Sequence, residues 1–138
     1  MPKQIIIKGR KVVGGVAEGE AIVSHEPVEG WINADYQRGI ITERGHPLRG
    51  IKLKDKIFVF PAPKGSGGWI RSFGWMPRYN VAPAAMLFTR GNCLTFQGAV
   101  LGNIPSMTDF DKDPVEIIET GDHVKVDADK GIVYVIKK

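Results

Sequence analysis

Cysteine is almost missing from this chain of 138 residues, in which Cys93 is the single example. One cysteine cannot form an intrachain disulfide or a cysteine cluster for a metal. Long hydrophobic runs are missing too, since no apolar stretch approaches the length of a membrane span. The apolar patch near the N-terminus is short and ends at Lys8, unlike a signal peptide. We therefore expect a cytoplasmic protein that does not bind the membrane and holds no metal of its own.

The chain also lacks a strong charge of one sign, because 19 basic residues against 15 acidic ones give a net charge of +4. Its lysines are scattered, which is typical of a solvated surface. One stretch, residues 69–79, mixes aromatic residues with Arg71 and Arg78. Such a mixture can hold single-stranded nucleic acid, but an amphipathic segment that packs on a sheet or on a partner is the preferred interpretation. Nucleic acid is therefore an unlikely partner.

Several apparent motifs do not meet the requirements of the sites they suggest. Residues 14–21 (GGVAEGEA) lack the Lys-Ser/Thr ending of a phosphate-binding loop, and their glutamates would repel phosphate. The acidic cluster at 109–113 lacks the glycine and terminal glutamate of a calcium loop, and its last member, Asp113, is placed to cap a helix at Pro114. The three histidines have no metal-ligand spacing, although His25 and His46 lie in loops, where function is common.

The hydrophobic pattern predicts a mixed α/β fold. Residues 57–60 and 84–88 are apolar runs typical of buried strands, and Asn92 is placed to cap a helix from 93 to about 101. The alternating segments 123–127 and 132–136 predict a hairpin, and residues 10–23 predict two short strands joined by a glycine-containing bend. A helix of about two turns within 67–80 would bury Ile70, Phe73 and Met76. Layered sheets with short helices, in one domain over 1–138, fit this order best.

The segment FVFPAPKGSGGW, residues 58–69, contains the most informative loop. Prolines end the strand, and the glycines after Lys64 allow close approach of the backbone to another group. Ser66 stands among these glycines just before the predicted helix. From the pattern alone it either caps that helix or takes part in chemistry.

Several segments resemble the small subunit, or swivel domain, of the aconitase X family. They follow the order of the family and cover nearly the whole chain. These segments are Gly14–Ala21 with Ser24, His46-Pro47-Leu48, Val59-Phe60-Pro61 leading to Lys64-Gly65-Ser66, Ala82-Pro83-Ala84-Ala85, Thr108-Asp109, Glu119–Asp122 and Val126–Gly131.

This resemblance implies a swivelling β/β/α domain similar to the mobile domain of aconitase. It implies a subunit of a dehydratase, a carbon–oxygen lyase that removes water from a small hydroxy acid and is inactive without its large subunit. The large subunit would hold an iron–sulfur cluster or iron, and this chain would bind no cofactor. The known substrate classes of the family are phosphorylated mevalonate and cis-3-hydroxy-L-proline.

The resemblance also assigns roles to residues of the loop. Ser66 is the expected proton acceptor, and Lys64 the expected positive charge beside its alkoxide or a substrate carboxylate. Gly65, Gly67, Gly68 and His46 are the remaining expected substrate-binding residues. At a surface between two subunits we expect an uncharged and partly aromatic face, formed by Trp69, Phe73 and Trp75.

One departure from the family concerns the substrate. Many members continue with further hydroxyl residues after Gly65-Ser66, whereas Gly67-Gly68-Trp69 follows here. This implies a differently shaped pocket and leaves the hydroxy acid open among phosphomevalonate, a hydroxyproline-like compound and others. Two alternatives from other classes are a non-catalytic binding or regulatory module with the same fold, and a single-stranded nucleic-acid binder.

Overall fold

The computed structural model describes residues 3–30, 33–65 and 67–138. Within them, eight strands form one sheet in the order β1-β12-β11-β3-β7-β9-β10-β2. The long strand β3 lies in the middle, because its first half pairs antiparallel with β11 and its second half pairs parallel with β7. The strands are β1 (Gln4–Lys8), β2 (Arg10–Val13), β3 (Val16–Val23), β7 (Ile57–Phe60), β9 (Ala85–Phe88), β10 (Ser106–Thr108), β11 (His123–Asp127) and β12 (Ile132–Ile136).

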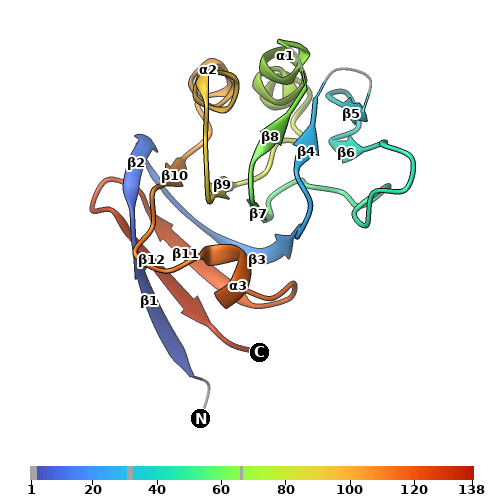
Figure 1. The fold of residues 1–138 in the computed structure, drawn as a ribbon. Coiled ribbons are helices and arrows are strands. Elements are labelled where there is room, and N and C mark those ends of the chain that lie inside the picture. Colours follow the sequence, from blue (N-terminus) through green and yellow to red (C-terminus); the bar gives the residue numbers. More distant parts are fainter. Residues whose placement is uncertain (1–2, 31–32, 66) are drawn as a thin grey trace.

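The two edge strands of this sheet are consecutive in the chain. β1 pairs with β12 at one edge, β2 pairs with β10 at the other, and only Gly9 separates β1 from β2. The sheet therefore bends back on itself into two layers. Figure 1 shows the antiparallel layer of β1, β11 and β12 at the lower left and the layer of β7, β9 and β10 above it, beneath the helices.

Short helices and two small sheets complete the fold. Helices α1 and α2 lie side by side over the strand layer, and α3 lies on the opposite side (Figure 1). Two-stranded sheets join β4 to β8 and β5 to β6 beside α1. The bounds are α1 (Gly68–Gly74), η2 (Met76–Tyr79), α2 (Cys93–Gly102), α3 (Pro114–Ile117), β4 (Val28–Glu29), β5 (Ala34–Asp35), β6 (Ile40–Ile41) and β8 (Pro63–Lys64).

Two hydrophobic cores explain why the central strands are apolar on both faces. In β7, Ile57 and Val59 pack between the two sheet layers, whereas Phe58 and Phe60 pack against the helices. Side chains alternate between the faces of a strand, so an uninterrupted apolar run serves both cores at once. The predicted β/β/α layering is confirmed.

Several helix boundaries agree with the predictions made from local sequence signals. The Asn92 side chain accepts hydrogen bonds from the backbone N–H groups of Leu94 and Thr95. The Thr95 hydroxyl in turn accepts one from the backbone N–H of Asn92, and the two residues form a capping box at the start of α2. Asp113 caps α3 by accepting from the N–H of Val115 at 3.0 Å. Asn103, in the left-handed conformation with φ 51°, is the C-cap of α2, so the helix ends within a residue of its predicted end at about 101.

The predicted buried face of the helix after the glycine loop is wrong at one position. Trp69 and Phe73 are fully buried, whereas Ile70 is only partly buried. Two glycines allow the close approach of Trp69: a Cβ at Gly98 would lie 2.7 Å from the Trp69 ring, and a Cβ at Gly30 would lie within 3 Å of the Trp69 backbone. Its indole N–H donates to the Val28 carbonyl at 3.1 Å and so ties α1 to β4.

Candidate active site

The glycine loop lies at the carboxyl ends of the parallel strands. β3, β7 and β9 run parallel, so the segments that follow them meet at one edge of the sheet. The backbone N–H of Ser24, after β3, donates to the Val59 carbonyl at 2.8 Å, and that of Arg90, after β9, donates to the Pro61 carbonyl at 2.9 Å. This edge is where open α/β sheets bind ligands.

The loop is held on one side by β4 and continues into α1 on the other. Lys64 pairs with Glu29 in the parallel β4–β8 ladder. Gly65 has φ +93°, and a Cβ there would lie 2.8 Å from the Glu29 Cγ, so glycine is required at this position. Gly67 is the N-cap of α1. Ser66, the predicted proton acceptor, lies outside the described residues.

Lys64 is paired with an acidic residue that the sequence analysis did not identify. Its Nζ donates to Glu43 Oε2 at 2.9 Å. This hydrogen bond raises the pKa of Lys64 against the opposing effect of burial, and the charges of Glu43, Glu29 and Glu26 add to the rise. Lys64 is therefore a permanent cation beside the loop. The other Glu43 oxygen, Oε1, is buried and accepts no hydrogen bond within the described part of the chain.

His46 is buried beside the turn that follows β3, with 5% of its surface exposed. Its Nδ1 accepts a hydrogen bond from the backbone N–H of Leu48 at 3.0 Å, so the neutral ring carries its proton on Nε2. That nitrogen lies 3.5 Å from the Ser24 hydroxyl, which itself donates to the Glu26 carbonyl at 2.6 Å. The contacts place His46 as a support for the 24–26 turn, and its predicted contact with substrate stays a prediction.

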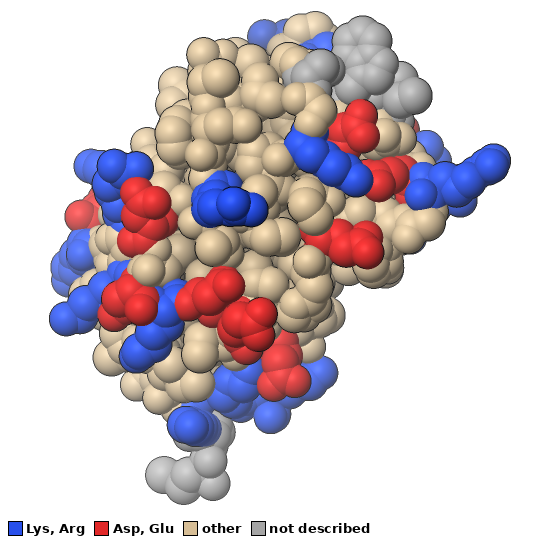
Figure 2. Space-filling view, viewed as in Figure 1, with Lys and Arg blue, Asp and Glu red and all other residues tan. Residues whose placement is uncertain are grey.

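The surface beside the loop differs from the expected uncharged, aromatic face. Trp69 and Phe73 are fully buried in the core and cannot contribute to it. Figure 2 shows acidic and basic side chains over β4 and β8 instead, whereas the area over α2 is uncharged. The burial of Trp69 and Phe73 also removes two of the rings on which the nucleic-acid alternative depended, whereas Trp75 is partly buried and Tyr79 is exposed.

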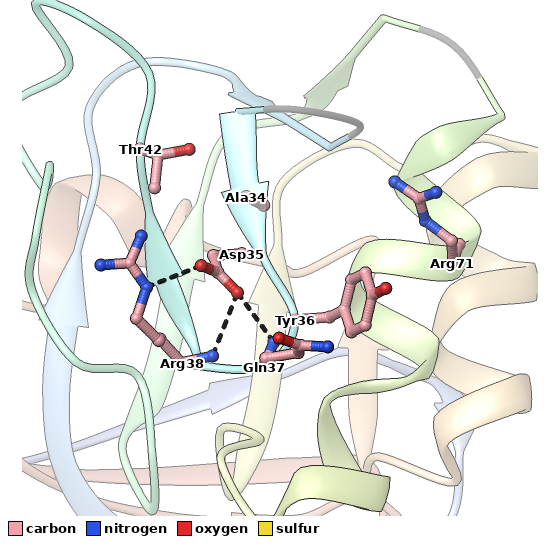
Figure 3. A pocket seen from close by; sticks show the side chains of 7 residues that line it. All are labelled: Ala34, Asp35, Tyr36, Gln37, Arg38, Thr42 and Arg71. Atoms are coloured by element: carbon pink, nitrogen blue, oxygen red, sulfur yellow. Dashed lines mark hydrogen bonds and ion pairs between the residues drawn. The ribbon is translucent and has the colours of Figure 1, made fainter.

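A second feature near the loop is a pocket of about 470 Å³ between α1 and the β5–β6 hairpin. Two arginines line it from opposite sides, Arg38 from the hairpin turn and Arg71 from α1 (Figure 3). From the sequence, Arg71 is expected only as part of an amphipathic segment, and no sequence signal marks Arg38. The other residues that line the pocket are Ala34, Asp35, Tyr36, Gln37 and Thr42.

The part of the chain that the structure describes holds neither a metal-ligand cluster nor a membrane-spanning helix. Over residues 3–30, 33–65 and 67–138, no group of three or more His, Cys, Asp or Glu side chains is arranged to hold a metal ion. In the same ranges no helix has the length and apolarity needed to cross a membrane.

The chain belongs to the aconitase X swivel domain family, whose model matches residues 6–135. Among curated proteins it is 36% identical to the phosphomevalonate dehydratase small subunit of Methanococcoides burtonii, with 97% of this chain and 98% of that one covered. It is 37% identical to the small subunit of the same name from Thermococcus kodakarensis, with 95% and 96% covered.

A solved structure shows the same fold. The holo-form of aconitase X from Thermococcus kodakaraensis superposes with a TM-score of 0.90 at 36% identity, covering 96% of this chain and 99% of that chain. The resemblance read from the sequence motifs is thereby confirmed for both the family and its fold.

Proposed function

We propose that this chain is the small subunit of an aconitase-X-type dehydratase that removes water from phosphomevalonate. The observation that carries the proposal is the match, over nearly the whole of both chains, to proteins named as phosphomevalonate dehydratase small subunits. The position of the glycine loop supports it, because the loop lies exposed at the carboxyl ends of the parallel strands.

The burial of Trp69 removes an objection to this substrate. The sequence left the hydroxy acid open because a tryptophan follows Gly67-Gly68 and was expected to reshape the pocket. Trp69 is fully buried, and its indole N–H donates to the Val28 carbonyl inside the protein. The ring therefore takes no space on the open side of the loop, and the departure from the family pattern gives no reason to exclude a phosphorylated substrate.

In the proposed mechanism Ser66 takes the proton from the carbon next to the substrate carboxylate. A serine hydroxyl is a poor base unless the alkoxide is stabilised, and a protonated Lys64 two residues away supplies positive charge for the alkoxide or the carboxylate. The negative charge of Glu43 lies beside the positive charge of Lys64. Removing the Glu43 charge, or burying the ion pair under a partner, would change the strength of the electrostatic interaction between Lys64 and the alkoxide or carboxylate. Ser66 would return the proton in the reverse reaction.

The remaining part of the site belongs to a large subunit in this proposal. The described residues offer no metal-ligand cluster, so an iron–sulfur cluster or iron would be bound by the partner. It would supply a Lewis acid for the leaving hydroxyl. The partner would close over the glycine-loop face, where Lys64 is 44% exposed in this chain. Its contacting surface must then match charged groups, in place of the aromatic face expected from the sequence.

The test is single-turnover dehydration of phosphomevalonate by the complex reconstituted with the large subunit. Ser66→Ala removes the proposed base and should lower the rate roughly 100-fold or more, the usual scale for a lost general base. Complex formation and substrate affinity should change little, because neither needs the hydroxyl proton.

Lys64→Ala is the contrasting variant. It removes a charge that acts on substrate as well as on the base, so both affinity and rate should fall. A Ser66→Ala complex with a nearly normal rate would exclude Ser66 as the base. A wild-type complex that dehydrates cis-3-hydroxy-L-proline and leaves phosphomevalonate unchanged would reassign the substrate. The absence of any dehydration by an assembled complex would favour a non-catalytic module.

A further inference from the structure

The pocket between α1 and the β5–β6 hairpin has the charge and shape of an anion site. Two arginines and one acidic residue line it, together with Thr42 and Tyr36, whose side chains carry hydroxyl groups. Figure 3 shows Arg38 and Asp35 on one side of the space and Arg71 on the other. Guanidinium groups bind carboxylates and phosphates through paired N–H donors. Two of them facing one space therefore favour a group with several acceptor oxygens.

Arg71 is held in place by an aromatic cluster. Its guanidinium lies over the Tyr36 ring at 5.3 Å from the ring centre. Tyr36 in turn contacts Trp75 edge to face at 5.4 Å and Tyr79 at 5.6 Å. A guanidinium stacks through its face and donates hydrogen bonds through its edge, so this contact and anion binding do not compete. The cluster lowers the conformational entropy that Arg71 would lose on binding.

Arg38 is held by Asp35 on the opposite side. Its Nε donates to Asp35 Oδ2 at 2.6 Å, while Asp35 Oδ1 accepts from the backbone N–H groups of Gln37 and Arg38. Burial tends to raise the pKa of Asp35, but the hydrogen bonds from Arg38 and Gln37 outweigh it and lower the pKa. Asp35 is therefore a fixed anion that orients Arg38 and offsets one of the two positive charges.

Two segments of the chain connect the pocket to the glycine loop. Thr42, in its lining, is followed by Glu43, which pairs with Lys64 at 2.9 Å. Arg71 lies in α1, three residues after Gly68, where this helix begins directly after the loop. A substrate whose reacting carbon meets Ser66 could thus extend its far end toward the arginines.

We propose that this pocket binds the phosphate group of the substrate, with Arg71 as the main phosphate-binding residue and Arg38 as the second. This inference rests on the proposed function for the identity of the substrate, but not for the anion site itself. It assigns a specificity role to this chain, since the residues that distinguish a phosphorylated hydroxy acid from an unphosphorylated one would lie in the small subunit.

The experiment compares steady-state kinetics of the reconstituted complex carrying wild-type chain, Arg71→Gln or Arg78→Gln. Arg78 is the matched control, because its guanidinium also lies 5.3 Å from an aromatic ring, that of Trp75, but outside the pocket lining. Arg71→Gln should raise KM for phosphomevalonate at least tenfold and change kcat less than about threefold, and it should raise the inhibition constant of inorganic phosphate by a similar factor. Arg78→Gln should change neither.

Three outcomes would overturn the proposal. One is an unchanged KM and phosphate inhibition in Arg71→Gln. Another is a weaker complex with unchanged KM once assembled, which would mean that the pocket holds an acidic side chain of the large subunit. The last is an equal effect of Arg78→Gln.

A wild-type complex that does not turn over phosphomevalonate would contradict the proposed function, and the pocket is then tested without turnover. Inorganic phosphate is titrated into the complex and the NMR signals of the labelled small subunit are followed. Shifts at Tyr36 and Arg38 that disappear in Arg71→Gln would sustain the anion site. No shift up to about 50 mM phosphate, where even a weak millimolar site would be filled, would overturn it.

Discussion

Gly65 and Gly67 lie on either side of Ser66, but the fold requires only the first to be glycine. Gly65 has φ +93°, and a Cβ there would lie 2.8 Å from the Glu29 side chain. Gly67 has φ −58° and ψ −13°, a conformation open to any residue, and a Cβ there would meet no atom within 4 Å. Nothing in the part of the chain that the structure describes therefore explains Gly67, whereas a substrate or partner lying against the loop would.

This difference gives a prediction at the residue scale. Gly67→Ala should leave the free energy of unfolding unchanged or raise it by about 0.5 kcal/mol, because alanine reduces the entropy of the unfolded chain. In the assembled enzyme the same variant should raise KM roughly tenfold, since the added methyl occupies space needed by the substrate. Gly65→Ala is the comparison, and it should lose stability. Wild-type KM in Gly67→Ala would remove Gly67 from the substrate-binding residues.

At the scale of elements, one buried carboxylate fastens the end of α3 and the turn before β11 to the end of β12. Asp122 is fully buried and accepts hydrogen bonds from the backbone N–H groups of Glu119 and Lys138 and from the Lys137 ammonium at 2.6 Å. Lys137 also donates to the Ile117 carbonyl. Burial favours the neutral acid, but these hydrogen bonds outweigh it and lower the pKa of Asp122.

Asp122→Asn should lower the free energy of unfolding at pH 7 by about 2 kcal/mol, since the neutral amide loses the charge-assisted hydrogen bond from Lys137, which is 20% exposed and keeps its ion pair with Glu119 at 3.0 Å. The pKa of Asp122 is lower in the folded state, so its stabilisation is fully present above the unfolded value of about 3.9 and is lost as the pH falls through the folded value. Urea unfolding between pH 7 and pH 2 should show a weaker acid dependence in the variant.

Glu20→Gln is the matched control for that prediction. Glu20 pairs with Lys56 at 3.0 Å, but both side chains are largely or partly exposed, at 51% and 33%. Exposed ion pairs contribute about 0–1 kcal/mol, so this variant should remain close to wild type over the whole pH range. Equal losses in the two variants would contradict the role given to burial at Asp122.

Elements specified by neighbouring residues were predictable from the sequence, and contacts between distant segments were not. The strand 57–60 and the start of α2 at Asn92 depend on apolar runs and on a cap, both of which are local signals. The burial of Trp69 depends on Gly30 and Gly98, which lie on other elements. A helix of seven residues is also too short for its apolar spacing to define one face.

The candidate site likewise combines a part that was predictable from the sequence with a part that was not. The glycine loop was recognisable from its family motif. Glu43 and Arg38 became candidates only after the β5–β6 hairpin folded against α1 and the loop, and no spacing in the sequence predicts that contact.

At the scale of the whole molecule, the purified chain should contain no iron and show no dehydratase activity alone. Cys93 is its single cysteine, and the residues that the structure describes include no metal-ligand cluster. Elemental analysis and the visible spectrum of the isolated chain and of the complex provide the measurement, and iron should appear only in the complex. Stoichiometric iron in the isolated chain would refute the proposed division of the site between subunits.

β1, which precedes the bend at Gly9, depends on the last strand, β12, for its pairing. β1 can complete the sheet only when β12 is present, because β12 lies between β1 and β11. Contacts between such distant segments carry a large loop-closure cost before they contribute any stability, and they slow folding. During translation β1 must wait, unpaired, until the β11–β12 hairpin has left the ribosome. We therefore expect β1 of the nascent chain to be protease-sensitive until β12 has emerged, and to become resistant once the two strands have paired.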